Sequence, residues 1–325
     1  MMNNMYIGFI TDPIEAFNTK KDSSFAMMLA AQARGWMLYY MQQKDLYVRD
    51  GIVYADMQAL QVKDQLNDYY QIDESITQPL HQLDAVLMRK DPPFDMEYIY
   101  STYLLELAAK QGLLVVNRAD SIRSANEKFF TTEFPEYCPE TLVTRDMQRI
   151  KQFIKELGHI VVKPLDGMGG AMVFQIKQGD PNTNVILETI TQYGTQTIIA
   201  QRFLPEYKQG DKRILIINGK PFPHALARIP AEGEGRANLA AGGEGLGVDL
   251  SDKEFEICER LTPRLQEMGL MFVGLDVIGD YITEINVTSP TCIRELDKLY
   301  SADIAGLLMD EIEIVLQNTM KNRQQ

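Results

Sequence analysis

Residues 161–170 read Val161-Val162-Lys163-Pro164-Leu165-Asp166-Gly167-Met168-Gly169-Gly170. Apolar runs at 160–163 and 172–176 flank these three glycines, and the pattern predicts a hairpin with an open loop. Glycine lets the backbone approach a ligand closely, and consecutive amides form a nest for an anion. Lys163 adds a positive charge suited to phosphate. A phosphate-binding loop and a ligand-free turn fit this spacing equally well, and the Gly-Lys-Ser/Thr of a P-loop is absent.

The strand expected after residue 280 carries Glu284 and Asn286, which share a face because side chains alternate along a strand. A carboxylate and an amide oxygen suit Mg²⁺ bridged to phosphates. Polar residues on a solvated strand face are the commoner alternative. Asp276 favours the metal interpretation, because it lies inside the apolar run 271–278, where a charge is costly unless it is paired or coordinating.

The hairpin between these two strands decides whether both carboxylates serve one metal ion. With a two-residue turn at Gly279-Asp280, Leu275 faces Glu284 and Asp276 points to the other face. A three-residue loop places Asp276 opposite Glu284 instead. A site with two carboxylates therefore requires a longer loop or a β-bulge.

Residues 229–247 contain six of the chain's 22 glycines. We expect this stretch to form neither helix nor strand, because glycine has the most conformational freedom to lose. A surface linker is one interpretation. The other is a lid that is mobile without substrate and closes over a reactive intermediate, with Arg236 reaching an anionic substrate.

The overall composition indicates a soluble globular protein. The chain has 325 residues, is 45% hydrophobic and 24% charged, and is long enough for two or three domains. A net charge of −13 argues against nucleic acid or an anionic membrane as the partner. The three cysteines lack a CxxC pair, and neither a signal peptide nor a membrane span is visible. We therefore expect a cytoplasmic protein.

The order of predicted elements changes near residue 126. Before it, apolar runs alternate with helices expected at 23–34, begun by Ser23 or Ser24, and at 97–111, which predicts a mostly parallel sheet covered by helices. Asp50-Gly51 predicts one hairpin in this first part. After residue 126 hairpins dominate, and Asn218-Gly219 is among the best two-residue turn signals. Further helices are expected at 147–157, 183–192, 252–268 and 303–320.

Several strings along the chain, in colinear order, resemble the ATP-grasp superfamily and closely resemble the prokaryotic glutathione synthetases. The Lys-Pro string at 163–164 and the Glu-Ile-Asn string at 284–286 indicate ATP-grasp alone. The Lys-Asp-Ser-Ser string at 21–24 and the Arg-Lys-Asp-Pro-Pro string at 89–93 narrow the resemblance to glutathione synthetase. The other matching strings are at 226–230, 238–243 and 273–280.

The resemblance implies an ATP-grasp fold of mixed α/β and α+β class. It implies an N-terminal Rossmann-like parallel-sheet domain that binds substrate (1–125), a central lid domain (126–204) and a C-terminal antiparallel-sheet domain with the metal site and the glycine-rich lid loop (205–325). ATP would lie between the last two. The chain departs from the family pattern at Glu244, where the family has a basic residue.

The implied reaction is ATP-dependent ligation of γ-L-glutamyl-L-cysteine and glycine to glutathione through an acyl phosphate, with release of ADP and phosphate. The implied cofactors are ATP and Mg²⁺, with Mn²⁺ as an alternative, and the implied assembly is a homo-oligomer, either a tetramer or a dimer. Another ATP-grasp carboxylate–amine ligase and a non-catalytic nucleotide-binding regulator are the alternatives.

The resemblance also assigns roles to single residues. The acyl phosphate would face Arg213 and Arg228, which together with Arg236 of the lid form the predicted catalytic set, and the dipeptide would contact Arg89, Ser289 and Thr291. Mg²⁺ would be bound by Asp276, Glu284 and Asn286. The phosphates of ATP would be contacted by Lys128 and Lys163, and the flexible glycine loop over them would consist of Gly167, Gly169 and Gly170. The adenine would be read by the hinge of Gln201, Arg202, Phe203 and Leu204. The ribose would be held by Asp211.

Overall fold

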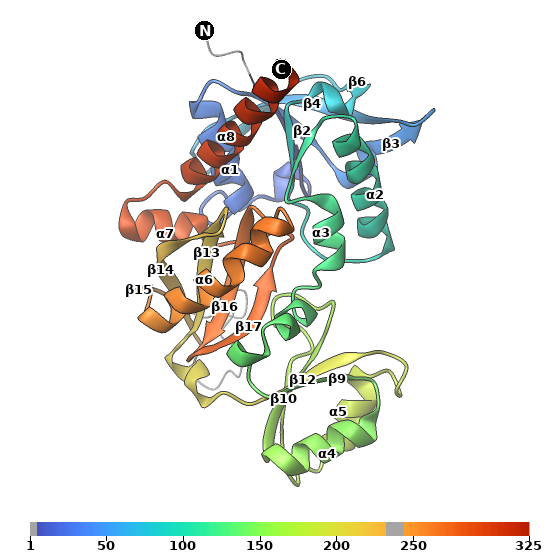
Figure 1. Cartoon of the computed structure of the whole chain (residues 1–325), viewed down its shortest axis with the longest axis vertical. Coiled ribbons are helices and arrows are strands. Elements are labelled where there is room, and N and C mark those ends of the chain that lie inside the picture. Colours follow the sequence, from blue (N-terminus) through green and yellow to red (C-terminus); the bar gives the residue numbers. More distant parts are fainter. Residues whose placement is uncertain (1–4, 232–243, 325) are drawn as a thin grey trace.

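The computed structural model describes residues 5–231 and 244–324, which fold around three sheets (Figure 1). The first sheet has eight strands, and its central order β2-β1-β7-β8 is parallel. The Asp50-Gly51 turn, with φ of 51° and 78°, folds the chain back, so the other strands are antiparallel and the sheet is mixed rather than mostly parallel. Its strands are β1 (Tyr6–Ile10), β2 (Met37–Met41), β3 (Leu46–Arg49), β4 (Ile52–Val62), β5 (Tyr70–Ile72), β6 (Ile76–Pro79), β7 (Ala85–Met88) and β8 (Leu114–Val116).

Helices α1 (Ser23–Ala33), α2 (Met96–Lys110) and α3 (Ala119–Ser124) accompany this sheet, and the C-terminal helix α8 (Ile304–Gln324) packs beside α1 (Figure 1). The cap of α1 is Asp22, whose carboxylate accepts the Phe25 amide at 2.8 Å, so the prediction of a serine cap was wrong. Ser23 and Ser24 are buried and accept hydrogen bonds from elsewhere in the chain instead.

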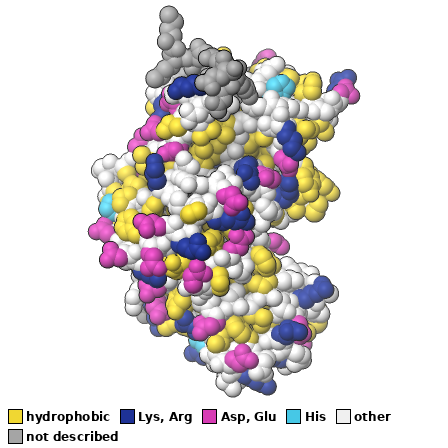
Figure 2. Space-filling model, viewed as in Figure 1, with side chains coloured by type: hydrophobic (Ala, Val, Ile, Leu, Met, Phe, Trp, Pro, Cys, Tyr) yellow, Lys and Arg dark blue, Asp and Glu magenta, His cyan; other side chains and the backbone are white. Residues whose placement is uncertain are grey.

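Helix α2 presents apolar side chains to solvent. Met96, Tyr100 and Tyr103 are 51–53% exposed and lie at i, i+4 and i+7, along one side of the helix. Figure 2 shows hydrophobic side chains gathered over this helix.

The second sheet forms the lower lobe of Figure 1 and has the order β11-β10-β12-β9, all antiparallel. Its hydrophobic core lies between the sheet and its two helices, where Ile150, Val162 and Leu187 are buried. The elements are β9 (Thr141–Thr144), α4 (Met147–Leu157), β10 (His159–Pro164), β11 (Phe174–Lys177), α5 (Thr183–Ile190) and β12 (Ile198–Arg202).

The third sheet is antiparallel with the order β15-β14-β13-β16-β17. Asn218 and Gly219, both at positive φ, turn β13 into β14 as predicted. Each sheet lies within one of the three predicted domain ranges, whose boundaries stay a prediction. The elements are β13 (Asp211–Ile217), β14 (Lys220–Ile229), β15 (Glu244–Asp249), α6 (Asp252–Glu267), β16 (Phe272–Ile278), β17 (Tyr281–Asn286) and α7 (Ile293–Tyr300). Short 3-10 helices occur at Ile14–Ala16, Gln43–Asp45, Leu80–Gln82, Phe129–Glu133, Pro135–Tyr137 and Pro205–Gln209.

Strand β15 corrects one expectation. Residues 244–247 were predicted to form neither helix nor strand, yet they pair with β14. A Cβ on Gly247 would lie 2.7 Å from the Tyr300 hydroxyl, so the absence of a side chain is what lets the strand pass this ring. Ile229, at the other end of the predicted lid, is likewise in a strand as the last residue of β14, and residues 232–243 with Arg236 lie outside the described residues.

Candidate active site

A cleft lies between the second and third sheets, and all ten residues that the resemblance assigned to ATP line it. Lys163 and the glycine loop come from β10 and the segment after it, and Lys128 comes from the segment before the 3-10 helix Phe129–Glu133. The hinge 201–204 lies at the end of β12, and Asp211 begins β13. The opposite wall contains Asp276 and Glu284. Segments far apart in the sequence thus meet at one place.

The register of β16 and β17 brings the expected metal ligands onto one face. Ile278 pairs with Tyr281 across the two-residue turn, but Asp276 pairs with Glu284 and Gly274 with Asn286. Thr283 is therefore the extra residue of a β-bulge. Of the two ways to place both carboxylates together, the protein uses the bulge and keeps the short turn.

Asp276 lies at the centre of a buried ionic network. Its Oδ1 accepts from Arg213 Nε at 2.5 Å, and its Oδ2 lies 3.0 Å from Arg228 Nη2. Burial opposes ionisation of Asp276, but the charges of both arginines outweigh it and hold its pKa below the usual value. Both arginines predicted to face an acyl phosphate are thus fixed beside the expected metal face.

Arg228 also ties Asp211 to this network, with Nη2 2.8 Å from Asp211 Oδ2. Burial raises the pKa of Asp211 to about 6, and the nearby Arg228 limits the rise. Asp211 Oδ1 is buried and has no hydrogen-bond partner among the described residues. Since Asp211 lines the cleft, this oxygen is an acceptor suited to a ligand hydroxyl.

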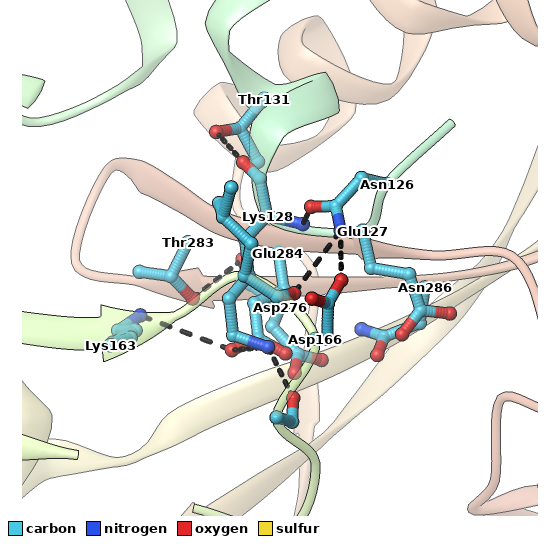
Figure 3. A network of polar contacts seen from close by, with 12 residues as sticks. Asn126, Glu127, Lys128, Thr131, Lys163, Asp166, Asp276, Thr283, Glu284 and Asn286 are labelled. Atoms are coloured by element: carbon cyan, nitrogen blue, oxygen red, sulfur yellow. Dashed lines mark hydrogen bonds and ion pairs between the residues drawn. The ribbon is translucent and has the colours of Figure 1, made fainter. Parts of the chain in front are cut away.

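Two ammonium groups lie close to Glu284 of the expected metal face (Figure 3). Lys128 Nζ donates to the Gly167 carbonyl at 2.6 Å and lies 3.7 Å from Glu284 Oε1. Lys163 Nζ lies 4.0 Å from the same oxygen. Positive charge therefore sits between the glycine loop and the expected metal ligands, where an anion such as phosphate would be stabilised.

A second pocket adjoins the cleft, and Met168 and Gly169 line both. Its lining contains Arg213 and Arg228, and also the predicted dipeptide contacts Ser289 and Thr291 together with Asn286. Asp91 and Glu127 line it as well. No role was predicted for either residue from the sequence. Asp91 belongs to the Arg-Lys-Asp-Pro-Pro string, whereas Glu127 had no signal beyond its neighbour Lys128.

Arg89 lies outside this lining. Its side chain is buried, donates to Ser24 Oγ at 3.0 Å and to the Pro290 carbonyl at 2.8 Å, and lies over the Phe272 ring. The structure therefore places Arg89 as a support for the loop at residue 290, and direct contact with the dipeptide is not supported by its position.

The expected metal ligands form a chemically suitable set. Asn286 Nδ2 donates to the Gly274 carbonyl at 3.1 Å, which leaves its side-chain oxygen as an acceptor next to Glu284. Two carboxylates and an amide oxygen are hard ligands of the kind Mg²⁺ prefers. Within residues 5–231 and 244–324, no group of three His, Cys, Asp or Glu side chains is placed to hold a metal.

In the part of the chain that the structure describes, no helix is long and apolar enough to cross a membrane.

The three cysteines are buried and unpaired, and burial raises the pKa of Cys138 to about 11 and that of Cys258 to about 12. Both therefore stay as unreactive thiols near neutral pH.

Comparison with known proteins agrees with this arrangement. The family described as "Prokaryotic glutathione synthetase, N-terminal domain" matches residues 5–123, and "Prokaryotic glutathione synthetase, ATP-grasp domain" matches 127–301. A glutathione synthetase of Shewanella oneidensis is 55% identical over 94% of this chain and 98% of its own. One of Pseudomonas aeruginosa is 56% identical over 94% of this chain and 96% of its own.

Among solved structures, the ATP-grasp ligase PsnB, complexed with minimal precursor, Mg and ADP, aligns with a TM-score of 0.61. The alignment covers 96% of this chain and 98% of PsnB, at 15% identity, and so shows the shared fold alone. The two family matches and the high identity to the bacterial enzymes go further. The chain belongs to the prokaryotic glutathione synthetases, a family of ATP-grasp ligases that form carbon–nitrogen bonds.

Proposed function

We propose that the chain joins γ-glutamylcysteine to glycine, with cleavage of ATP to ADP and phosphate. The observation that carries the proposal is the likeness to the two bacterial glutathione synthetases along nearly the whole chain. The adjoining pockets support it, because one holds the residues suited to ATP and the other holds arginines suited to a carboxylate. A cytoplasmic location is part of the proposal.

The adenine would be read at the end of β12. The Arg202 amide donates to the Glu140 carbonyl, and the Phe203 amide donates to the His159 carbonyl. These two amides are therefore already hydrogen-bonded within the protein and are not the donors for adenine. In an extended chain, residues 202 and 204 direct their backbone groups to the same side. The Arg202 carbonyl and the Leu204 amide are therefore the pair that would bind adenine. Of the four predicted hinge residues, these two would make the hydrogen bonds to the base.

The phosphates would lie under the glycine loop, beside Lys128 and Lys163. Asp276, Glu284 and Asn286 would hold Mg²⁺ or Mn²⁺, which would supply Lewis-acid neutralisation of the phosphate oxygens. Arg213 and Arg228 would stabilise the charge on the carboxylate oxygen as it takes up the phosphoryl group. Transfer of this kind needs positioned positive charges rather than a side-chain nucleophile. The amine of glycine would then attack the acyl phosphate, and phosphate would leave.

A coupling assay tests this function. We expect phosphate release to require γ-glutamylcysteine and glycine together, with one glutathione formed per phosphate. Release with another carboxylate and amine, but not with this pair, would instead indicate a different ATP-grasp ligase. Nucleotide binding without phosphate release under any of these conditions would indicate a regulator.

Replacing Lys163 by alanine should weaken binding of a non-hydrolysable ATP analogue by about 10- to 100-fold, the range for one hydrogen bond to a charged group. Isothermal titration calorimetry measures this directly. Lys155→Ala, on the exposed side of α4, is the matched control and should bind like the parent. Equal affinity in parent and folded Lys163→Ala would remove Lys163 from the phosphate site.

A homo-oligomer, either a dimer or a tetramer, also belongs to the proposal. The exposed stripe of Met96, Tyr100 and Tyr103 on α2 supports it, since contiguous exposed apolar side chains commonly mark an interaction surface. Light scattering coupled to size exclusion determines the number of subunits.

A further inference from the structure

Asn126, Glu127 and Lys128 follow one another in the chain and contact both walls of the cleft (Figure 3). We infer that Glu127 is a positioning residue, which holds the metal-face strand β17 in fixed relation to the glycine loop. The inference rests on the proposed function, because it concerns the alignment of phosphates with the metal ligands.

Glu127 binds the outer edge of β17. This strand ends the described third sheet, with β16 on its inner side. The Ile285 amide donates to the Glu127 backbone carbonyl at 2.8 Å, and the Val287 amide donates to Glu127 Oε1 at 2.8 Å. Alternate amides on one edge of a strand are the groups that a neighbouring strand would bind. Glu127 therefore takes the place of a further strand at the point where Glu284 and Asn286 lie.

The same carboxylate oxygen also fixes the turn that follows β17. Glu127 Oε1 accepts from the Thr288 amide at 3.0 Å and from the Thr288 hydroxyl at 2.8 Å. Three donors thus converge on one charged oxygen, and such charge-assisted hydrogen bonds are among the stronger ones in proteins. The turn leads directly to Ser289 and Thr291 in the second pocket, so its position also affects that lining.

The two neighbours of Glu127 hold the glycine loop. Asn126 Nδ2 donates to the Leu165 carbonyl at 3.2 Å and to Asp166 Oδ1 at 3.3 Å. Lys128 Nζ donates to the Gly167 carbonyl at 2.6 Å. The start of the loop and the end of the metal strand, more than one hundred residues apart in sequence, are therefore tied to three consecutive residues.

This arrangement has a direct consequence for catalysis. Phosphoryl transfer depends on positioning and charge neutralisation, and a displacement of about 1 Å can lower the rate by about 100-fold. If Glu127 acts through β17, its loss should reduce the metal-dependent part of nucleotide binding and the turnover number. The adenine site at the end of β12 should be unaffected. The acceptor oxygen, rather than the negative charge alone, should be what matters.

The test compares Glu127→Ala and Glu127→Gln with the parent. Calorimetry measures ADP affinity with and without Mg²⁺, and kinetics separate kcat from the KM of each substrate. For Glu127→Ala we expect unchanged ADP affinity without metal, loss of the tightening that Mg²⁺ gives the parent, and a kcat about 100-fold lower. Glu127→Gln keeps an acceptor oxygen and should recover most of both quantities. Glu136→Gln, an exposed carboxylate nearby in the chain, is the control and should match the parent.

Other outcomes would overturn the inference. A raised KM for γ-glutamylcysteine or glycine in both Glu127 variants, with the Mg²⁺ effect intact, would make Glu127 a ligand for the substrate ammonium. A lower melting temperature with unchanged kcat and unchanged Mg²⁺ effect would make its role purely structural. Failure of the parent itself to form glutathione would instead count against the proposed function, and calorimetry with ADP and Mg²⁺ would still decide the role of Glu127.

Discussion

Replacing Arg228 by methionine should lower the free energy of unfolding by about 3–5 kcal/mol, the range found when one partner of a buried ion pair is removed. Arg228 pairs with Asp211 at 2.8 Å, and among the described residues it is one of two arginines that pair with Asp276. Methionine fills similar space without a charge. The decrease in stability therefore measures the cost of leaving the two buried carboxylates without this positive charge. Ligation should also be lost, because the proposed acyl phosphate would lack one of its arginines.

The loss of stability should depend on pH. The pKa of Asp211 is already raised to about 6 in the folded protein, and losing Arg228 raises it further. A carboxyl group whose folded pKa is above its unfolded value destabilises the fold as pH rises through that interval. Urea unfolding should therefore show a larger deficit at pH 8 than at pH 5.5.

A second substitution tests the cause. Adding Asp211→Asn to Arg228→Met removes the stranded carboxylate and should restore part of the stability at pH 8. Arg260→Met, which breaks an exposed pair with Glu136, is the control and should change stability by less than about 1 kcal/mol. Equal losses at both pH values, without recovery in the double variant, would show that packing rather than charge explains the effect.

Glu284→Gln and Asn286→Ala should each remain folded and lower the turnover number by roughly 1000-fold, the scale on which single charge-neutralising groups contribute to phosphoryl transfer. Their side chains share one face of β17 opposite Asp276 and Gly274. The effect should appear as a shifted requirement for Mg²⁺, since each substitution removes or weakens a proposed ligand.

Activity is measured across a Mg²⁺ titration, with circular dichroism as the check on folding. Asp280→Asn changes an exposed carboxylate in the turn of the same hairpin and should leave the titration unchanged. Full activity of either site variant at low Mg²⁺ would show that this face of β17 does not bind the metal and is an ordinary solvated strand face.

Features set by nearby residues were predictable from the sequence. The turns at Asp50-Gly51 and Asn218-Gly219 need positive φ, which these residue pairs supply, and both occur. Helix α4 has its predicted bounds, Met147–Leu157, because Asp146 caps it and Gly158 ends it. Helices α3 and α7 were not predicted, and for α3 the reason is its length, since six residues give little periodic signal.

Features set by distant residues were not predictable. Strand β15 forms because its backbone pairs with that of β14, although the glycines of β15 disfavour a strand. The Ser23 hydroxyl accepts a hydrogen bond from the Ile293 amide, and the Glu127 carboxylate accepts one from the Val287 amide. Both pairs of residues are far apart in the sequence. The family resemblance identified the cleft residues, and these long-range contacts explain how they are held.

The bulge at Thr283 also affects how related sequences are compared. Seven residues separate Asp276 from Glu284, and the two face each other only because Thr283 is unpaired. A hairpin one residue shorter, without a counterpart of Thr283, would present the same two carboxylates in a regular ladder. Single-residue insertions and deletions at this point are thus compatible with one ligand geometry. A search that demands a fixed interval between the two acids would discard chains able to build this site, so gaps in alignments belong at this position.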